Sequence, residues 1–385
     1  MNIGILKERK QDERRVSLQP HQAGQLVDDG HHIFVETGAG ELAQYPDPAY
    51  LQAGAEIVPK QHVLDHCELL LKVKCPIAEE YRDYRANQIL FTYLHFDENL
   101  SKAKTLELIN SGFLGIAYEW VEKDGTYPLL ESMSKMTGYL FYQRSVELLA
   151  QHKGVLAGAY DKALKGATIL IIGLGRIGTG VLKCSLLNKL NVIVVARNHQ
   201  QVLDKICAVF GPNRPAEPPL IIPFDNDEHE ECKRRISELM PKLDIVVNCA
   251  VRRPNLPKEK MEYFIDKAMI QQMQPHSIVC DATACDRDFI ETCVSSESLT
   301  HYDLIDGVIH YSPDHIPSYV PKSSTELLTD ATFEYVRLIA NQGIKEAIKI
   351  NEALRKGVSC YNGSITHQYT ANKKGFEYVD ILNIL

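Results

Sequence analysis

Short apolar runs alternate with amphipathic stretches along the first part of the chain. The runs have the length of β-strands and lie at Ile3–Leu6, Ile33–Glu36, Leu69–Val73 and Gln88–Tyr93. The stretches between them have apolar positions at helical spacing, at Gln22–Asp29, Ala49–Gly54 and Leu100–Ser111. Strands that alternate with helices indicate βαβ units. We therefore predict a parallel sheet covered by helices.

The same alternation restarts near residue 167. Ala167–Ile172 is apolar throughout, as in a strand buried on both faces, and Ile177–Leu190 follows it as a helix. Further strands are predicted at Asn191–Ala196, Leu243–Ala250 and Ser277–Asp281. The proline-rich segment Gly211–Pro223 predicts a loop, and Asp330–Arg355, which lacks proline, predicts one long helix. The chain is thus expected to be an α/β protein with two sheets.

Length and composition agree with this expectation and exclude several classes of protein. A chain of 385 residues is too long for a single core, so two domains are expected. A net charge of −8 argues against nucleic acid or an anionic membrane as the main partner. The first apolar run precedes its charges, unlike a signal peptide, and no run is long enough to span a membrane, so we expect a cytoplasmic protein. The ten cysteines form no CxxC pair and predict free thiols rather than a metal site.

A glycine-rich turn lies between the strand ending at Ile172 and the following helix. Residues 166–180 read GATILIIGLGRIGTG, in which Gly173, Gly175 and Gly178 form G-x-G-x-x-G around Arg176 and Ile177. Such glycines allow a tight turn, close approach of the backbone to a pyrophosphate, and close packing of helix on strand. The helix N-terminus would face the phosphates. The turn therefore predicts a dinucleotide site.

The end of the next strand bears on the choice of dinucleotide. NAD-binding proteins usually carry an acidic residue there for the ribose 2′-hydroxyl, whereas this chain has Ala196 followed by Arg197 and Asn198. An arginine can pair with a 2′-phosphate. NADP(H) is therefore favoured, with the alternative that Arg197 only faces solvent and NAD(H) is also used.

Several motifs in order along the chain resemble the alanine dehydrogenase family, which includes the N-terminal part of the proton-translocating transhydrogenase. They include Glu13-Arg14-Arg15-Val16, Val35-Glu36-Thr37-Gly38-Ala39-Gly40, Leu71-Lys72-Val73-Lys74-Cys75-Pro76, Phe91-Thr92-Tyr93-Leu94-His95 and Ala117-Tyr118-Glu119. Saccharopine-dehydrogenase-like relatives share the same fold. The resemblance implies two doubly wound, Rossmann-like parallel-sheet domains with a cleft between them. Residues 1–128 plus 306–385 would form the substrate domain and 129–305 the dinucleotide domain, in a homo-oligomer, either dimer or hexamer.

The resemblance also implies roles for individual residues. Arg15 and Lys74 match the substrate-binding cations of the family, and Lys72 and Lys74 are expected on one face of a strand. His95 matches the catalytic histidine, and imidazole exchanges protons near neutral pH. Lys74 is counted with it among the catalytic residues. Met133, Ser134 and Val251 match positions near the cofactor.

The sequence departs from the family pattern close to these positions. Where relatives keep an aspartate near the catalytic histidine, this chain has Cys285 followed by Asp286, so Asp286 is a candidate catalytic residue only if a local bulge moves it into place. His315 stands where an asparagine close to substrate and nicotinamide is usual, so it is a candidate substrate-binding residue. Arg252 and Arg253 follow a strand where relatives are apolar. The two arginines would suit a substrate with a second acidic group.

These observations favour an amino-acid dehydrogenase that moves a hydride between a nicotinamide, with NADP favoured, and the α-carbon of an amino or imino acid. The first alternative is an opine-type reductase, which condenses an amino acid with a 2-oxo acid as in saccharopine or carboxyethyl-ornithine formation. The second is a non-catalytic, NADP-binding regulatory protein. In each case the partners are small molecules.

Overall fold

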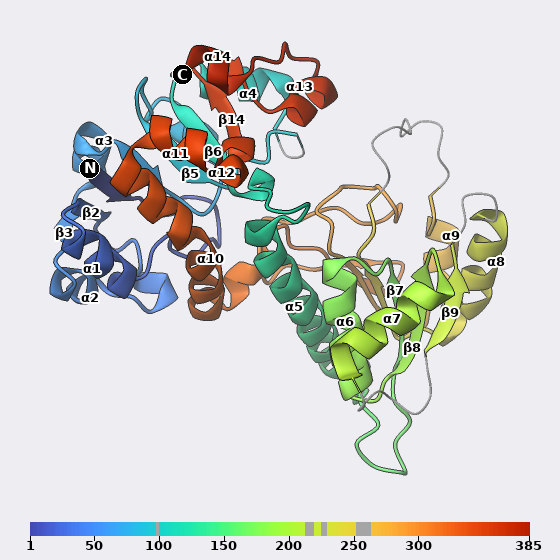
Figure 1. The fold of residues 1–385 in the computed structure, drawn as a ribbon. Coiled ribbons are helices and arrows are strands. Elements are labelled where there is room, and N and C mark those ends of the chain that lie inside the picture. Colours follow the sequence, from blue (N-terminus) through green and yellow to red (C-terminus); the bar gives the residue numbers. More distant parts are fainter. Residues whose placement is uncertain (98–99, 212–218, 225–228, 252–262) are drawn as a thin grey trace. The chain divides into compact units, whose positions relative to one another are not determined.

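The computed structural model describes residues 1–97, 100–211, 219–224, 229–251 and 263–385. They divide into two compact units, Met1–Met133 with Ser318–Leu385, and Ser134–Pro317. Both ends of the chain, blue and red in Figure 1, belong to the first unit. The assignment of residues 1–128 with 306–385 to substrate and of 129–305 to dinucleotide stays a prediction. No described helix combines the length and apolar character that a membrane crossing requires.

The first unit is built on a mostly parallel sheet with the strand order β15-β14-β6-β5-β4-β1-β2-β3. The strands β1 to β6 run parallel, β14 pairs antiparallel with β6, and β15 pairs antiparallel with β14. Their bounds are β1 (Asn2–Ile5), β2 (His32–Glu36), β3 (Glu56–Val58), β4 (Leu69–Leu71), β5 (Ile89–Thr92), β6 (Leu114–Ala117), β14 (Val358–Tyr361) and β15 (Ser364–Ile365).

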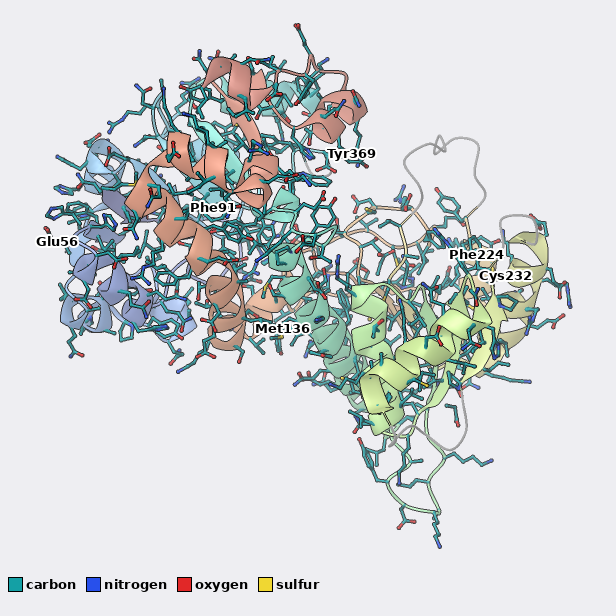
Figure 2. The ribbon with its side chains drawn as sticks, viewed as in Figure 1. Glu56, Phe91, Met136, Phe224, Cys232 and Tyr369 are labelled. Atoms are coloured by element: carbon teal, nitrogen blue, oxygen red, sulfur yellow. The ribbon has the colours of Figure 1, made fainter. Side chains whose placement is uncertain are left out.

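Both faces of this sheet are buried, as the unbroken apolar runs predicted. Successive side chains of a strand point to opposite faces. Leu69 and Leu71 of β4 accordingly pack in one core cluster with Phe91, while Leu70 packs in another with Leu90. Figure 2 labels Phe91 within the first unit. The covering helices are α1 (Pro20–Asp28), α2 (Asp47–Gln52), α3 (Lys60–His66), α4 (Lys102–Ile109), α10 (Pro321–Gln342), α11 (Ile344–Ile350), α12 (Glu352–Gly357), α13 (Gln368–Lys374) and α14 (Ile381–Ile384), with short 3₁₀ turns η1 (Glu41–Ala43), η2 (Ala78–Glu80) and η3 (Tyr118–Trp120).

The prediction of one helix over residues 330–355 is wrong. The chain forms α10, α11 and α12 in succession, and the breaks lie at Gly343 and Asn351. Gly343 has φ 71°, which ends a right-handed helix and which glycine adopts without strain. Asn351 then begins α12, where its side-chain oxygen accepts a hydrogen bond from the Leu354 amide at 2.9 Å. Absence of proline was therefore not sufficient evidence for continuity.

The second unit has a sheet with the strand order β12-β13-β11-β10-β7-β8-β9, in which only β12 is antiparallel to its neighbour. The strands are β7 (Thr168–Ile172), β8 (Asn191–Ala196), β9 (Leu220–Pro223), β10 (Ile245–Asn248), β11 (Ile278–Asp281), β12 (Asp303–Ile305) and β13 (Val308–Tyr311). The helices are α6 (Arg176–Leu187), α7 (His199–Phe210), α8 (His229–Leu239) and α9 (Lys267–Ile270), with the 3₁₀ turn η6 (Met240–Lys242). Helix α5 (Pro128–Lys153) and the turn η8 (Ile316–Tyr319) contain the boundaries between the units. Two mostly parallel α/β domains are thus confirmed.

The predicted loop at Gly211–Pro223 is wrong for its last four residues. Leu220–Pro223 is strand β9, which pairs in parallel with β8 at the edge of the sheet. Ile221 and Ile222 are buried, and Pro223 is tolerated because an edge strand need not donate every backbone N–H. Residues 212–218 lie outside the described part of the chain.

Candidate active site

In the first unit the strand order changes direction between β1 and β4, which lie side by side although two strands separate them in sequence. Ligands of open α/β sheets bind at such switch points, outside the carboxyl ends of the strands. Arg15 lies in the segment after β1, Lys74 follows β4, and His95 follows β5. The topology therefore brings the three predicted substrate residues to one edge of one sheet.

Arg15 is held by a buried carboxylate. Its side chain is 2% exposed, and its Nε and Nη2 donate to the two oxygens of Glu13 at 2.8 and 2.7 Å. Burial acts to lower the pKa of Arg15, but Glu13 outweighs it and raises that pKa. Nη1 lies 3.3 Å from the sulfur of Met133. Glu13 thus fixes the plane of the guanidinium, and Met133, predicted near the cofactor, lies beside Arg15 in this unit.

Tyr93 connects the two other predicted residues. Its ring stacks on the imidazole of His95, with centroids 5.3 Å apart and an interplanar angle of 7°. The Nζ of Lys74 lies 6.0 Å from the centre of the same ring. The Tyr93 hydroxyl donates to the Leu129 carbonyl at 2.9 Å, and burial raises the pKa of this phenol. Tyr93 was not predicted as a site residue, because its stack on His95 forms in the turn after β5, where strand alternation no longer applies.

The backbone of His95 is in the left-handed region, with φ 46°. This conformation costs a non-glycine residue about 1–2 kcal/mol. The carboxylate of Glu119, in the turn η3 after β6, accepts the backbone N–H of His95 at 2.5 Å and that of Leu94 at 3.2 Å. Burial raises the pKa of Glu119, while His95 opposes that shift. Glu119 therefore holds the turn that presents the imidazole.

A buried ion cluster lies next to Lys74. Strand β4 ends at Leu71, so the expectation that Lys72 and Lys74 share a strand face is wrong. Lys72 is instead fully buried, with its Nζ 2.9 Å from Glu80 and 3.7 Å from Glu8. Glu8 also accepts the backbone N–H groups of Val73 and Lys74 at 2.6 and 3.3 Å. The cluster fixes the backbone at the residue that presents the Lys74 ammonium.

In the second unit, the glycine-rich turn has the geometry that a pyrophosphate needs. Gly173 has φ 84°, and a Cβ on Gly178 would lie 2.0 Å from the Gly173 carbonyl oxygen, so helix α6 could not pack so closely with any larger residue. A Cβ on Gly175 would meet nothing within 4 Å and would occupy open space in front of the helix. Arg176 and Ile177 begin α6. The turn follows β7 at the point where β10 and β8 flank it, which is the switch point of this sheet. These residues fit a dinucleotide.

The end of β8 lacks an acidic side chain. Ala196 ends the strand, Arg197 is exposed, and Asn198 caps α7 by accepting the amides of Gln200 and Gln201 at 2.7 and 3.3 Å. No described carboxylate lies within ion-pair distance of Arg197. A positively charged side chain and a capped helix start therefore lie where an adenosine ribose would be bound.

Three further positions near the predicted catalytic site, Cys285, Asp286 and His315, lie in the second unit. The exposed carboxylate of Asp286 accepts the amide and hydroxyl of Ser295 at 2.7 and 2.6 Å. Cys285 is half-buried, and its Sγ lies 3.5 Å from the carbonyl of Thr283. The side chain of His315 is fully buried, with Nδ1 against Asp314 and Nε2 without a hydrogen-bond partner among the described residues.

The remaining positions lie in α5 and at the strand ends of the second unit. Ser134 is in α5, and Val251 is 60% exposed after β10. Arg252 and Arg253 lie outside the described residues. Asp281, at the end of β11, is buried. Its carboxylate accepts a hydrogen bond from the side-chain amide of Asn248 at 3.0 Å, and burial raises its pKa. Among the residues that the structure describes, no group of three or more His, Cys, Asp or Glu side chains is arranged to hold a metal ion.

Two protein-family models match the chain. Residues 4–137 match the N-terminal domain, and residues 143–368 the C-terminal domain, of alanine dehydrogenase/PNT. The chain belongs to the alanine dehydrogenase/PNT family. The alanine dehydrogenase of Bacillus subtilis is 32% identical, over 98% of this chain and 96% of the relative. That of Methanococcus maripaludis is 32% identical, over 98% of each.

Solved structures show the same relationship. A structure of L-alanine dehydrogenase matches with a TM-score of 0.83 and 29% identity, over 97% of this chain and 99% of that chain. The transhydrogenase from Sinorhizobium meliloti matches with a TM-score of 0.74 at 18% identity, over 96% and 100%, and shares the fold. As a member of the alanine dehydrogenase/PNT family, the chain is a nicotinamide-dependent oxidoreductase that acts on CH–NH₂ groups.

Proposed function

We propose that the chain is an amino-acid dehydrogenase that prefers NADP(H) and interconverts a small 2-oxo acid plus ammonia with the corresponding amino acid. The observation that carries this proposal is that Arg15, Lys74, Tyr93 and His95 follow the parallel strands β1, β4 and β5 at one edge of one sheet, where Lys74 and His95 both contact the Tyr93 ring. Two cations suited to a carboxylate lie there with an imidazole and an aromatic ring. The relatives named alanine dehydrogenase make pyruvate and alanine the first pair to test.

Each of these side chains has a chemical task in this proposal. Arg15, held flat by Glu13, and Lys74 bind the substrate carboxylate. His95, fixed by its stack on Tyr93 and by Glu119, takes up and returns the proton exchanged at the amine nitrogen or the attacking water. The nicotinamide, when bound, supplies or accepts the hydride at the α-carbon. Because the ion pair of Arg15 with Glu13 is buried, charge interactions of the guanidinium are stronger there than in water.

The test measures oxidation of NADPH and of NADH with a panel of 2-oxo acids, each with ammonium or with a second amino acid as amine donor. Turnover with ammonium supports the proposal. Turnover only with a second amino acid would replace it with an opine-type reductase, and cofactor binding without turnover would leave a regulatory protein. His95→Gln should lower kcat about 10²–10⁴-fold, whereas His21→Gln, on an exposed residue of α1, should not change it.

We propose NADP(H) over NAD(H) because Ala196 and Arg197 replace the acidic residue that would hold a 2′-hydroxyl. Arg197→Leu should raise the KM for NADPH about tenfold or more and leave the KM for NADH within about twofold, because only NADPH carries the 2′-phosphate. A wild-type enzyme that prefers NADH at least tenfold would overturn this part of the proposal and leave the dehydrogenase assignment intact.

A further inference from the structure

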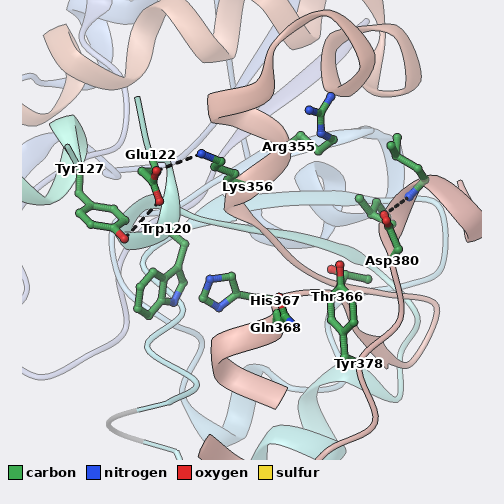
Figure 3. Close-up of a pocket in the computed structure, with 12 residues that line it drawn as sticks. Trp120, Glu122, Tyr127, Arg355, Lys356, Thr366, His367, Gln368, Tyr378 and Asp380 are labelled. Atoms are coloured by element: carbon green, nitrogen blue, oxygen red, sulfur yellow. Dashed lines mark hydrogen bonds and ion pairs between the residues drawn. The ribbon is translucent and has the colours of Figure 1, made fainter. Parts of the chain in front are cut away.

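A cavity of about 470 Å³ lies in the first unit, formed by residues that the candidate active site does not use. Its walls come from the turn after β6, from the end of α12, and from the C-terminal segment around α13 and α14 (Figure 3). Small-molecule sites commonly have volumes of about 300–1,000 Å³ and combine aromatic walls with a few polar groups. The cavity meets both conditions.

Aromatic rings form one side of the cavity. The rings of Trp120 and His367 lie 4.3 Å apart at 33°, and Tyr378 lines the cavity to the right of them in Figure 3. Burial lowers the pKa of His367 to about 4, so its imidazole is neutral at physiological pH. Its Nδ1 is bonded to Thr370 at 2.9 Å. The two uncharged rings thus lie against each other, and a further ring can stack only on an outer face of the pair.

Charges of opposite sign border the remaining sides. Lys356 is neutralised by Glu122 and Glu352 at 3.0 and 3.3 Å. Arg355, in contrast, donates only to main-chain carbonyls at the end of α11, at 3.2 and 3.4 Å, and no described carboxylate lies within ion-pair distance of it. Asp380 accepts the Leu382 amide at 2.9 Å, and no described basic side chain pairs with it. One cation and one anion without ionic partners therefore border the same cavity.

We propose that this cavity binds a free amino acid with an aromatic side chain. The ligand ring stacks on an outer face of the Trp120–His367 pair, its ammonium group meets Asp380, and its carboxylate meets Arg355. A zwitterion satisfies both charges at once, whereas an amine or an acid alone satisfies only one. This binding does not depend on the proposed function.

The turn η3 links the cavity to the candidate active site. Tyr118 packs edge-on against Tyr93 with ring centroids 5.1 Å apart, Glu119 holds the His95 amide, and Trp120 lines the cavity. Because the three residues are consecutive in one short turn, a ligand that moves Trp120 also moves the carboxylate that fixes His95. An effect on kcat follows if the proposed function is correct.

The experiment uses Trp120 as its own reporter, since it is the only tryptophan of the chain. Fluorescence of the full-length protein is titrated with L-phenylalanine, 3-phenylpropionate, phenethylamine and L-alanine. L-Phenylalanine should give a saturable change, and each analogue that lacks the amine, the carboxylate or the ring should bind at least tenfold more weakly. No saturable change with L-phenylalanine, or equal binding of the analogues, overturns the proposal.

Variants separate this cavity from the active site. Asp380→Asn keeps a capping side chain for α14 but removes the charge, and should weaken L-phenylalanine binding about tenfold. The matched control Asp28→Asn, on an exposed residue of α1, should not change it. Lys74→Met should also leave the titration unchanged. Loss of the signal in Lys74→Met with retention in Asp380→Asn would place the ligand in the active site and refute the cavity assignment.

Discussion

The buried carboxyl of Glu8 makes a quantitative prediction for stability against pH. Its side chain is 3% exposed, and burial raises its pKa from the usual 4.5 to about 7 despite the opposing charge of Lys72. Glu13 and Glu80 raise the same pKa further by repulsion. A raised carboxyl pKa means that the folded state holds the proton more tightly than the unfolded chain. This tighter proton binding stabilises the folded state fully below pH 4.5, and the stabilisation is lost as the pH rises from 4.5 through 7.

The size of the effect follows from the two pKa values. Their separation corresponds to about 3 kcal/mol of unfolding free energy in total, of which about 2 kcal/mol falls between pH 5.5 and 8.5. Glu8→Gln has no charge at either pH. The loss of stability between pH 5.5 and 8.5 should therefore be about 2 kcal/mol smaller in Glu8→Gln than in the wild type. The absolute stability can shift as well, because the contact with Lys72 changes, but the prediction concerns the pH dependence.

The assay is urea unfolding at pH 5.5, 7 and 8.5, followed by the fluorescence of Trp120, which lies in the same unit as Glu8. Glu346→Gln, on an exposed residue of α11, serves as the matched control and should follow the wild-type pH dependence. A Glu8→Gln curve parallel to the wild type within about 0.5 kcal/mol would refute the reasoning. In that case the pKa of Glu8 would be the same in the folded and the unfolded chain, and Glu8 would face Lys72 in the folded state as an ordinary ionised carboxylate.

Three further substitutions test the site and the fold. Gly178→Ala places a Cβ 2.0 Å from the Gly173 carbonyl, so NADPH affinity measured by fluorescence of the bound nicotinamide should fall at least tenfold, and unchanged affinity would contradict the packing argument. Tyr93→Leu removes the ring between Lys74 and His95 and should lower kcat/KM for the oxo acid about 10–100-fold without changing the Kd for NADPH. Gly343→Ala must keep φ 71° and ψ 156°, which essentially only glycine adopts, and should lower the urea midpoint by an amount equivalent to about 1–3 kcal/mol, so an unchanged midpoint would show that the helix break tolerates a side chain.

The sequence predicted those features whose cause is local. The strand before Gly173, the glycine turn and the helix after it follow from apolar length and glycine spacing, and the structure has them as β7 and α6. Residues that act through long-range contacts could not be found in the same way. Glu119 meets the His95 amide across 24 residues, and Glu8 meets Lys74 across 66, so neither pairing leaves a periodic signal. The prediction that Lys72 lies within the strand was wrong because the end of β4 is set by its pairing with β1 and β5 rather than by its own residues.

The two sheets share one topology, and this explains why the candidate residues lie where they do. In each sheet the first strand of its unit, β1 or β7, is flanked by the second strand on one side and by the fourth on the other. The chain must leave the carboxyl ends of these flanking strands in opposite directions, which opens a crevice at that edge. The first unit fills this edge with Arg15 and Lys74, whereas the second leaves it open with Gly175. The proposed substrate contacts and the proposed cofactor contacts thus lie in separate units, so Lys74→Met should raise the KM for the oxo acid while leaving the Kd for NADPH unchanged. A joint loss of both affinities in this variant would show that the two half-sites are not independent.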